Sequence, residues 1–227
     1  MKFHALICAR AGSKGIKNKN IRKFNGKPLI SYPIKLAKSI KGIESVSVST
    51  DSKKIASISR HYGADIPFIR SKKLSSSKAN EWDVWEDFVK KKKIKKKDDI
   101  IVILPATSPF RIKKDVEKCI SLYKKNFFDY VMVITKASHN PHFNMVKRNK
   151  NNLIKICMPL KKRIVRRQDA PKIYNITTIC FVVSAKFIMS KKSALKSGKV
   201  GAIEIPYERS LDLDTEFDLK VANLLNK

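Results

Sequence analysis

ICARAGSKGIKNKNI, residues 7–21, joins the end of an apolar run to a loop of glycine, lysine and amide side chains. The apolar run, residues 3–9, has the length of a buried strand and is too short to span a membrane. It runs straight into Gly12, Ser13, Lys14 and Gly15. Such a loop can point several backbone N–H groups at one anion, while lysine and arginine side chains close over the charge.

Two known phosphate-binding loops do not match this stretch. A P-loop has four residues between its first glycine and a Gly-Lys-Ser/Thr sequence, whereas Gly12 and Gly15 are only three positions apart. The dinucleotide fingerprint needs three glycines, and this stretch has two. The composition of the loop still favours a polyphosphate ligand, but a solvated basic turn explains the same residues almost as well. The other motifs of the chain are needed to choose between these two interpretations of the loop.

The chain has 227 residues, enough for one large domain with a substantial core. Its formal net charge of +31 suggests a nucleic-acid partner. However, 40 of its 50 basic residues are lysines spread along the whole chain, whereas nucleic-acid surfaces tend to use the planar fork of arginine. We therefore favour lysines on solvated surfaces over a nucleic-acid partner. The charge would still attract an anionic substrate.

The four cysteines, Cys8, Cys119, Cys157 and Cys180, are far apart and include no C-x-x-C pair. This pattern is typical of free thiols in a reducing compartment, and not of a zinc site or a disulfide framework. No apolar run reaches the length of a transmembrane helix. We therefore expect a cytoplasmic protein with no membrane partner.

Strand-like and helix-like segments alternate along the chain. Strands are expected at residues 3–9, 45–50, 66–69, 99–104, 129–135, 176–183 and 202–206. Helices are expected at residues 29–40, 52–62, 80–94 and 113–125. The alternation predicts an α/β fold, with a Rossmann-like, mostly parallel sheet flanked by helices. Ligands of such sheets bind beyond the carboxyl ends of the strands, which is where the opening loop would lie.

Residues 136–175 interrupt this alternation with a polar and basic stretch that holds only short apolar pieces. A compact domain rarely carries so long a loop unless the loop is a lid or an interface. An isolated arm could not offset its own ordering entropy, whereas a twofold partner would give its apolar pieces a surface to bury. We expect a single domain over residues 1–227, with an inserted dimerisation arm at 136–175.

Near the C-terminus, Asp212 and Asp214 stand one residue apart in an extended segment. Alternate residues of such a segment face the same side, with Cα atoms about 7 Å apart. Two carboxylates on one side are a natural seat for Mg²⁺, which completes its ligands with water and substrate phosphates. The alternative is that the aspartates only offset nearby lysines or cap the last helix.

The neighbours of these aspartates favour the metal site. Leu211 and Leu213 would bury the opposite face of the segment and so fix where the carboxylates point. Thr215 and Asp218 have the spacing of a capping box, which would begin the last helix.

Five motifs occur in order across nearly the whole chain: ARAGSKGIKNKNI (9–21), STDS (49–52), LPATSPFR (104–111), RRQDAP (166–171) and LDLDTEFD (211–218). Together they resemble the CMP-sialic acid synthetases, the acylneuraminate cytidylyltransferases, within the nucleotide-diphospho-sugar transferase fold. One such motif would be weak support, but five in order on an alternating fold are a strong signal. The resemblance implies that the opening loop holds the triphosphate of CTP.

The resemblance also implies a reaction, in which the anomeric hydroxyl of a 2-keto-3-deoxy sugar acid attacks the α-phosphorus of CTP and releases pyrophosphate. It assigns catalysis to Arg10, Lys19, Asp212 and Asp214, with Mg²⁺ held by the two aspartates. It assigns CTP binding to Arg10, Ala11, Gly12, Ser13, Lys14, Lys19, Asn20, Arg70 and Ser76, the last within a cytosine loop at residues 74–79. It assigns the sugar acid to Thr107, Ser108, Arg167, Gln168 and Tyr174. In the family the arm dimerises and reaches toward the partner's active site, so a homodimer with shared sites is implied.

Most departures from the family pattern lie on the sugar side. Pro105-Ala106 stands where Gln-Pro is usual, Thr177-Thr178 stands where Asn-Gly is usual, and Phe143 replaces a basic residue of the arm. The cytosine loop also has Ser77 where aspartate is common. The phosphate and metal motifs match, so cytidylyl transfer is expected, whereas the acceptor can be N-acylneuraminate, legionaminate, pseudaminate or another ulosonic acid.

Two other functions stay open at this point. One is another nucleotidyltransferase of the same fold, which would use a different nucleotide, an ulosonic acid such as 3-deoxy-octulosonate, or a sugar phosphate. The other is a basic, non-catalytic protein that binds nucleic acid. Binding of RNA or DNA without turnover of CTP would favour the latter.

Overall fold

A computed structural model describes residues 1–94, 99–125, 127–162, 164–190 and 194–225. Its centre is one six-stranded sheet with the strand order β10-β6-β9-β5-β1-β4. The strands are β1 (Lys2–Cys8), β4 (Ile43–Ser49), β5 (Asp99–Ile103), β6 (Tyr130–Lys136), β9 (Tyr174–Ser184) and β10 (Val200–Glu204). β1 is parallel to β4 and β5, and β10 to β6, whereas β9 runs antiparallel to both neighbours. The mostly parallel sheet is confirmed, and the antiparallel strand is a feature that the sequence did not predict.

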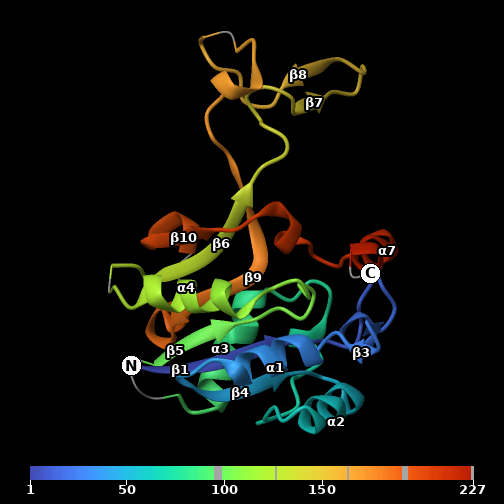
Figure 1. The fold of residues 1–227 in the computed structure, drawn as a ribbon, viewed down its shortest axis with the longest axis vertical. Coiled ribbons are helices and arrows are strands. Elements are labelled where there is room, and N and C mark those ends of the chain that lie inside the picture. The colour runs from blue at the N-terminus through green and yellow to red at the C-terminus, as the bar shows by residue number, and fades with distance from the viewer. Residues whose placement is uncertain (95–98, 126, 163, 191–193, 226–227) are drawn as a thin grey trace.

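Helices flank the sheet (Figure 1). They are α1 (Ser31–Ser39), α2 (Lys53–His61), α3 (Glu81–Lys91), α4 (Lys113–Tyr123), α5 (Ala185–Met189), α6 (Ala194–Ser197) and α7 (Glu216–Leu225). The strand β1 shows why both faces need cover, because Ala5 and Ile7 pack into one core with α1, α2 and α4, and Leu6 packs into another with α3 and α5. The four expected helices between strands are confirmed, each slightly shorter than predicted. Within the described residues, none of the helices combines the length and the apolar character that crossing a bilayer requires.

One expected strand is wrong. Residues 66–69 form no strand, and the chain meets the edge of the sheet only through isolated bridges at Asp65 and Ile69 in this described stretch. Pro67 lies between the two bridges and has no N–H to donate to a ladder. Ile66 is nevertheless buried in the core. Burial without pairing explains why an apolar pattern predicted a strand here.

An arm leaves the body of the molecule beyond β6 and β9, at the top of Figure 1. The first residues of β9 pair with the end of β6, beyond the part of β9 that pairs with β5. The arm holds an antiparallel hairpin, β7 (Val146–Arg148) and β8 (Ile154–Ile156), which the sequence did not predict. Its exposed apolar side chains include Val146, Leu153, Ile154, Met158, Leu160 and Val165. A single copy of the chain therefore leaves this apolar surface in water.

A small third core joins the opening loop to the C-terminal segment. Its buried members come from both ends of the chain and are Ile16, Phe24, Leu29, Leu213, Leu219 and Ala222. Phe24 belongs to a short hairpin of β2 (Lys23–Phe24) and β3 (Lys27–Pro28). The expected burial of Leu213 is confirmed, and Leu211 packs against the same core.

The predicted capping box at the start of α7 is confirmed. The backbone N–H of Thr215 donates to Asp218 Oδ2 at 2.7 Å, and the N–H of Asp218 donates to Thr215 Oγ1 at 3.2 Å. This reciprocal pair satisfies two N–H groups near the helix start. It also fixes the end of the segment that carries Asp212 and Asp214.

The opening loop meets the C-terminal segment at Gly15. A Cβ atom on this residue would overlap the carbonyl oxygen of Asp214 and would lie 3.2 Å from its carbonyl carbon. Because a carbonyl group of the backbone cannot move aside as a flexible side chain can, only glycine allows this approach.

We predict that Gly15→Ala lowers the free energy of unfolding by about 1–3 kcal/mol, because the added methyl group overpacks a backbone contact. Gly12→Ala is the matched control, since a Cβ atom on Gly12 meets nothing within 4 Å. Urea denaturation measures both variants. If Gly15→Ala were as stable as Gly12→Ala, the close contact would not constrain the loop.

Candidate active site

The carboxyl end of β1 opens onto a cleft of about 540 Å³, a size typical of small-molecule sites. Its walls come from the loop after β1, the loop before α3, the first turns of α3, the segment after β5 and the C-terminal segment. The lining residues are Cys8, Arg10, Ser13, Lys14, Gly15, Lys19, Asn20, Arg70, Leu74, Ser76, Ser77, Ala79, Glu81, Val84, Thr107 and Asp214. The cleft thus gathers most of the residues assigned to CTP.

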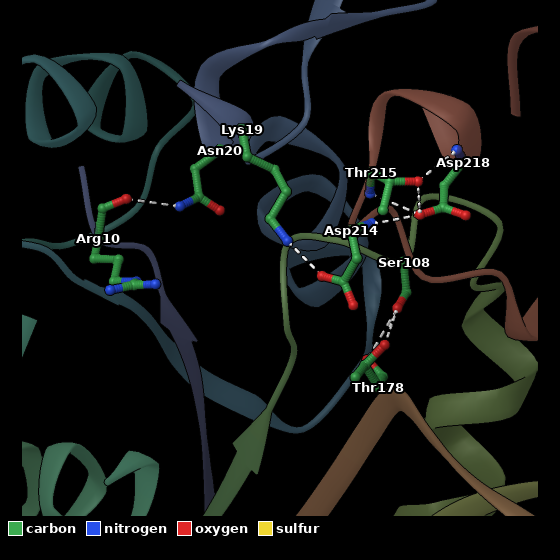
Figure 2. A network of polar contacts seen from close by, with 8 residues as sticks. All are labelled: Arg10, Lys19, Asn20, Ser108, Thr178, Asp214, Thr215 and Asp218. Carbon is green, nitrogen blue, oxygen red and sulfur yellow. Dashed lines mark hydrogen bonds and ion pairs between the residues drawn. The ribbon is translucent and has the colours of Figure 1, made fainter. Parts of the chain in front are cut away.

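The loop after β1 brings three cations to the cleft: Arg10, Lys14 and Lys19. Hydrogen bonds hold the start of this loop in place. Asn20 is buried, and its Nδ2 donates to the carbonyl oxygen of Arg10 at 2.9 Å (Figure 2). The N–H of Ala11 donates to Asp51 Oδ1 at 3.0 Å, which gives the STDS motif a positioning role.

Two predicted contacts of CTP lie elsewhere in the loop. Ala11 and Gly12 are exposed and do not line the cleft. Because the N–H of Ala11 is already bonded to Asp51, this N–H fixes the loop and is not free to bind a phosphate. The neighbouring Ser13 does line the cleft.

Lys19 links the two ends of the chain inside the cleft. Its Nζ lies 2.7 Å from Asp214 Oδ1, and Figure 2 shows the side chain extended toward this carboxylate. The Lys19 side chain is 16% exposed and that of Asp214 is 67% exposed. A pair so open to water adds little stability, so its main consequence is the position of the ammonium group.

Arg70 and the 74–79 loop form another wall of the cleft. Arg70 is buried, and its Nε donates to Ser75 Oγ at 3.0 Å. This bond ties the guanidinium to the loop that the resemblance assigns to cytosine. Ser76 lines the cleft as expected, together with Ser77, where the family often has aspartate.

Three residues of the cleft were not predicted: Cys8, Glu81 and Val84. Burial raises the pKa of the Cys8 thiol to about 12, and the charge of Glu81 adds to the shift, so Cys8 is a neutral thiol at neutral pH. Glu81 is exposed as a whole residue, yet the removal of its carboxyl group from water inside the cleft raises its pKa. The negative charge of Asp212 raises it further. Glu81 follows the Asn80 cap of α3 directly, and this position was the one signal in the sequence that could have placed it at the cleft.

Asp212 and Asp214 open onto different cavities. Asp214 lines the cleft, whereas Asp212 lines a neighbouring cavity of about 900 Å³ that also includes Tyr174 and Thr177. The sequence predicts that both carboxylates face one side, with Leu213 buried on the other, and Leu213 is buried. The segment nevertheless forms a wall between the two cavities, and Thr107, which lines the cleft, acts on the carboxyl group of Asp212 through this wall.

The carboxyl group of Asp212 is only partly satisfied. Its Oδ1 is buried and has no hydrogen-bond partner among the described residues. Burial raises the pKa of Asp212, hydrogen bonds from Thr107 and Thr178 oppose the shift, and the charge of Asp214 adds to it. A cation beside this carboxyl group would offset its unfavourable burial.

Thr107 and Ser108, the two residues after β5 that the resemblance assigns to the sugar acid, lie in different surroundings. Thr107 lines the cleft, whereas Ser108 is buried. The hydroxyl of Ser108 lies 2.7 Å from Thr178 Oγ1 and 3.1 Å from the carbonyl oxygen of Thr178 (Figure 2). Ser108 therefore fixes the segment against β9.

Arg167 and Gln168 lie at the base of the arm and line a separate cavity of about 460 Å³, together with Tyr174. The Nη2 of Arg167 donates to the carbonyl oxygen of Ser138 at 2.6 Å. Within one chain, neither residue lines the cleft or the cavity of Asp212. Tyr174 is the residue that lines both the arm cavity and the cavity of Asp212.

The sequence of the chain is similar to those of known proteins over nearly its whole length. The chain is 31% identical to the Post-translational flagellin modification protein B of Campylobacter coli, over 97% of this chain and 93% of that protein. It is 30% identical to the CMP-N,N'-diacetyllegionaminic acid synthase of Campylobacter jejuni, over 96% of this chain and 92% of that protein.

The fold is similar to that of a CMP:2-keto-3-deoxy-manno-octonic acid synthetase solved in complex with CTP, with a TM-score of 0.73. That likeness covers 100% of this chain and 99% of the other at 16% identity, so it bears on the fold alone. The family model described as "Cytidylyltransferase" matches residues 4–207, which is most of the chain. The chain therefore belongs to the cytidylyltransferase family.

Proposed function

We propose that the chain transfers CMP from CTP to the anomeric hydroxyl of a sialic-acid-like 2-keto-3-deoxy sugar acid and releases pyrophosphate. The acceptor belongs to the class of N-acylneuraminate, legionaminate and related acids, as the name of the Campylobacter jejuni relative supports. The product would serve glycan biosynthesis. A cytoplasmic location agrees with the four free cysteines.

The observation that carries this proposal is the set of groups gathered in one cleft. Arg10, Lys14 and Lys19 bring three cations to a triphosphate-sized space, and Arg70 holds the 74–79 loop beside them. Three cations suit the charge of a triphosphate. The serine-rich loop offers small polar groups to a base. A nucleoside triphosphate is the ligand that uses all of these groups.

The reaction replaces one bond at the α-phosphorus by another. The anomeric oxygen forms a bond to this phosphorus, the bond to the bridging oxygen of the β-phosphate breaks, and pyrophosphate leaves. Arg10 and Lys19 would stabilise the negative charge that moves onto the leaving group. Because Asp214 already holds Lys19 at 2.7 Å, the ammonium group is positioned before CTP enters.

The donor set of Asp212 and Asp214 fits Mg²⁺. Asp212 has a buried oxygen without a partner, and Asp214 carries an exposed carboxylate in the cleft. Among the described residues, no group of three or more His, Cys, Asp or Glu is placed to hold a metal, so a cation here would also need water and phosphate oxygens. When bound, Mg²⁺ would supply positive charge beside the reacting phosphate.

The cavity of Asp212 would take the acceptor. It shares the wall formed by residues 211–214 with the nucleotide cleft, so a sugar hydroxyl and the α-phosphorus could meet at this wall. Tyr174 offers a hydroxyl group to a sugar acid, whereas the buried hydroxyl of Thr177 donates to the carbonyl oxygen of Val133. The departures from the family pattern lie on this side, so the acceptor is proposed as a class. Another nucleotidyltransferase activity of the same fold is the second candidate, which the likeness to an octonic acid synthetase favours only as a relative.

The arm supports a homodimer with shared active sites. Its apolar side chains, from Val146 to Val165, lie in water in a single chain. A twofold partner would bury them. It could also bring Arg167 to the other subunit's acceptor cavity, where a guanidinium suits a carboxylate in a bidentate arrangement.

An assay of pyrophosphate release tests the function. With CTP and a panel of ulosonic acids, we expect turnover with sialic-acid-like acceptors and much less with other nucleoside triphosphates. Arg10→Ala should lower turnover by about 100-fold, because it removes a group that stabilises the leaving charge. Lys17→Ala is the matched control, since Lys17 is exposed in the same loop and does not line the cleft.

The same assay can contradict the proposal. Equal turnover in the Arg10→Ala and Lys17→Ala variants would mean that the opening loop is only a solvated basic turn. Absence of turnover with every acid, together with tight binding of RNA or DNA, would favour a non-catalytic binding protein.

A second prediction concerns the metal. Asp212→Asn and Asp214→Asn should each lower turnover by at least about 100-fold while keeping the fold, because the amide preserves shape but removes a negative ligand. Glu216→Gln, an exposed carboxylate close by in sequence, is the control and should keep near-normal turnover. Circular dichroism checks the fold, and Mg²⁺ titrations follow the activity. Near-normal turnover of both asparagine variants at low Mg²⁺ would rule out the assigned ligands.

A third prediction concerns the shared site. Chains with Arg167→Ala should be mixed with chains that carry Asp212→Asn, and subunit exchange should be verified. If each site uses Arg167 from one subunit and Asp212 from the other, mixed dimers regain one working site, and activity rises above either variant alone. A protein that stays monomeric at working concentration, or mixed dimers without recovery, would contradict a shared site.

A further inference from the structure

A further cavity, which we call the α1 cavity, lies between α1 and the segment after β5. It has a volume of about 350 Å³ and shares no lining residue with the nucleotide cleft. Thr107 lines the cleft, whereas its neighbour Ser108 and then Arg111 line the α1 cavity. The LPATSPFR segment therefore has a cleft on one side and a separate cavity on the other. The reaction proposed above does not use the α1 cavity.

The charges around this cavity are of one sign. Its described lining residues include four cations, Lys27, Lys35, Arg111 and Lys113, and no carboxylate. Two of the lysines have neighbours at the surface, because Lys113 lies 3.6 Å from Glu117 and Lys35 lies over the ring of Tyr62. Such exposed contacts are weak and exchange readily with a better partner. The four cations thus favour an anion in the space between them.

Arg111 is the buried cation of this cavity. It is 6% exposed, and its Nη2 donates to the carbonyl oxygen of Pro105 at 2.5 Å. No ion pair among the described residues includes Arg111, and its Nε has no hydrogen-bond partner there. Asp115, which acts on Arg111 only through its charge, gives both carboxylate oxygens to Arg209, at 2.9 and 3.1 Å. Burial lowers the pKa of Arg111 to about 10, and the charges of Asp212 and Asp115, neither of which forms an ion pair with it, oppose the shift only in part.

A second unpartnered group lines the same cavity. Ser31, the first residue of α1, is 1% exposed, and its hydroxyl has no hydrogen-bond partner among the described residues. Buried polar groups without partners are rare in native proteins and call for an unseen ligand or water. The first turn of α1 also turns the positive end of the helix dipole to this cavity, although the N–H of Tyr32 is bonded to the carbonyl oxygen of Leu29 and Pro33 has no N–H.

We propose that this cavity is a second anion site, which binds a phosphate-class oxyanion between the first turn of α1 and Arg111. The anion offsets the buried positive charge of Arg111, while the lysines at the rim draw it in. The volume of about 350 Å³ is ample for one or two phosphoryl groups with water. Inorganic phosphate and pyrophosphate are the two sources of this chemistry that the cavity can hold.

The site has a route to the reaction centre. Arg111 Nη2 lies 3.4 Å from the carbonyl oxygen of Thr178, which also accepts a bond from Ser108. The hydroxyl of Thr178 also acts on the carboxyl group of Asp212, whose pKa it lowers against the effect of burial. An anion that holds Arg111 in place therefore steadies the residue that positions Asp212. The second site is thus suited to sense phosphate or the pyrophosphate product.

NMR of the ¹⁵N-labelled protein tests the proposal. Inorganic phosphate, and separately pyrophosphate, should cause saturable shifts in the Nε–H signal of Arg111 and in the amide signals of residues 31, 32 and 34–36. The Nε–H signals of Arg10 and Arg70 report binding in the nucleotide cleft, so the two sites are followed separately. Comparison of the two dissociation constants tells whether one or two phosphoryl groups fill the cavity.

Substitutions make the test specific. Lys27→Gln with Lys113→Gln should weaken binding at Arg111 by about tenfold, as expected for the loss of two charge-assisted contacts. Lys38→Gln with Lys114→Gln is the matched control, because both residues are exposed and do not line the cavity. Lys38 lies on α1, and Lys114 follows Lys113 on α4. The control pair removes the same net charge and should weaken binding less than about twofold.

Replacement of Arg111 could unfold the protein, because Arg111 also bonds to the carbonyl oxygen of Pro105. Ser31→Ala is therefore the variant that tests the buried part of the site. It should keep the stability of the chain, since it deletes an unpaired hydroxyl, and should weaken anion binding by about threefold. Three results would overturn the proposal: no saturable shift at Arg111 with either anion, equal weakening by the control pair, or unchanged affinity in Ser31→Ala.

Discussion

The approach of Gly15 to the carbonyl group of Asp214 is the constraint on which the cleft depends. It leaves no room for a side chain, so the loop after the first strand and the segment before the last helix must pack backbone to backbone. The small core around Ile16 and Leu213 holds this contact from below. The Lys19–Asp214 pair then joins residues 195 positions apart across the cleft. Any shift of the loop would separate the cations that suit a triphosphate from the carboxylate that suits a metal.

The parts of this arrangement that sequence could predict are those fixed by local pattern. Alternating apolar runs gave the strands and helices, because period and length depend on neighbours in sequence. The burial of Leu213 and the Thr215–Asp218 cap followed from spacing within one short segment. The place of the opening loop followed from the rule that loops at the carboxyl ends of parallel strands carry the site.

The parts that sequence could not predict depend on distant contacts. The antiparallel course of β9 is set by the arm, which returns the chain to the sheet from the far end of β6. Glu81 lines the cleft because α3 begins there; the Asn80 cap places Glu81 at the start of a helix, but only the packing of that helix in the fold brings it to the cleft. Leu213 is buried between Asp212 and Asp214 as expected, but whether the two carboxylates open onto one cavity or two depends on distant residues that line these cavities, among them Thr107 and the start of β9. Ser108, which shares a motif with Thr107, is turned inward by Thr178.

Three of the six buried polar atoms without a partner among the described residues point to what the chain alone leaves incomplete; the other three belong to Ser49, Trp85 and Asp99. Asp212 Oδ1, Arg111 Nε and Ser31 Oγ all lie around the segment after β5 or the walls that it supports. Their charges differ in a useful way. The acidic group lies beside the cleft, where a cation would satisfy it, and the basic group lies behind the segment, where an anion would. Thr178 contacts both sides, through Asp212 on one and through Arg111 and Ser108 on the other. A segment held between two incomplete sites of opposite charge can be steadied by either ligand, so occupation of one favours the geometry that the other needs.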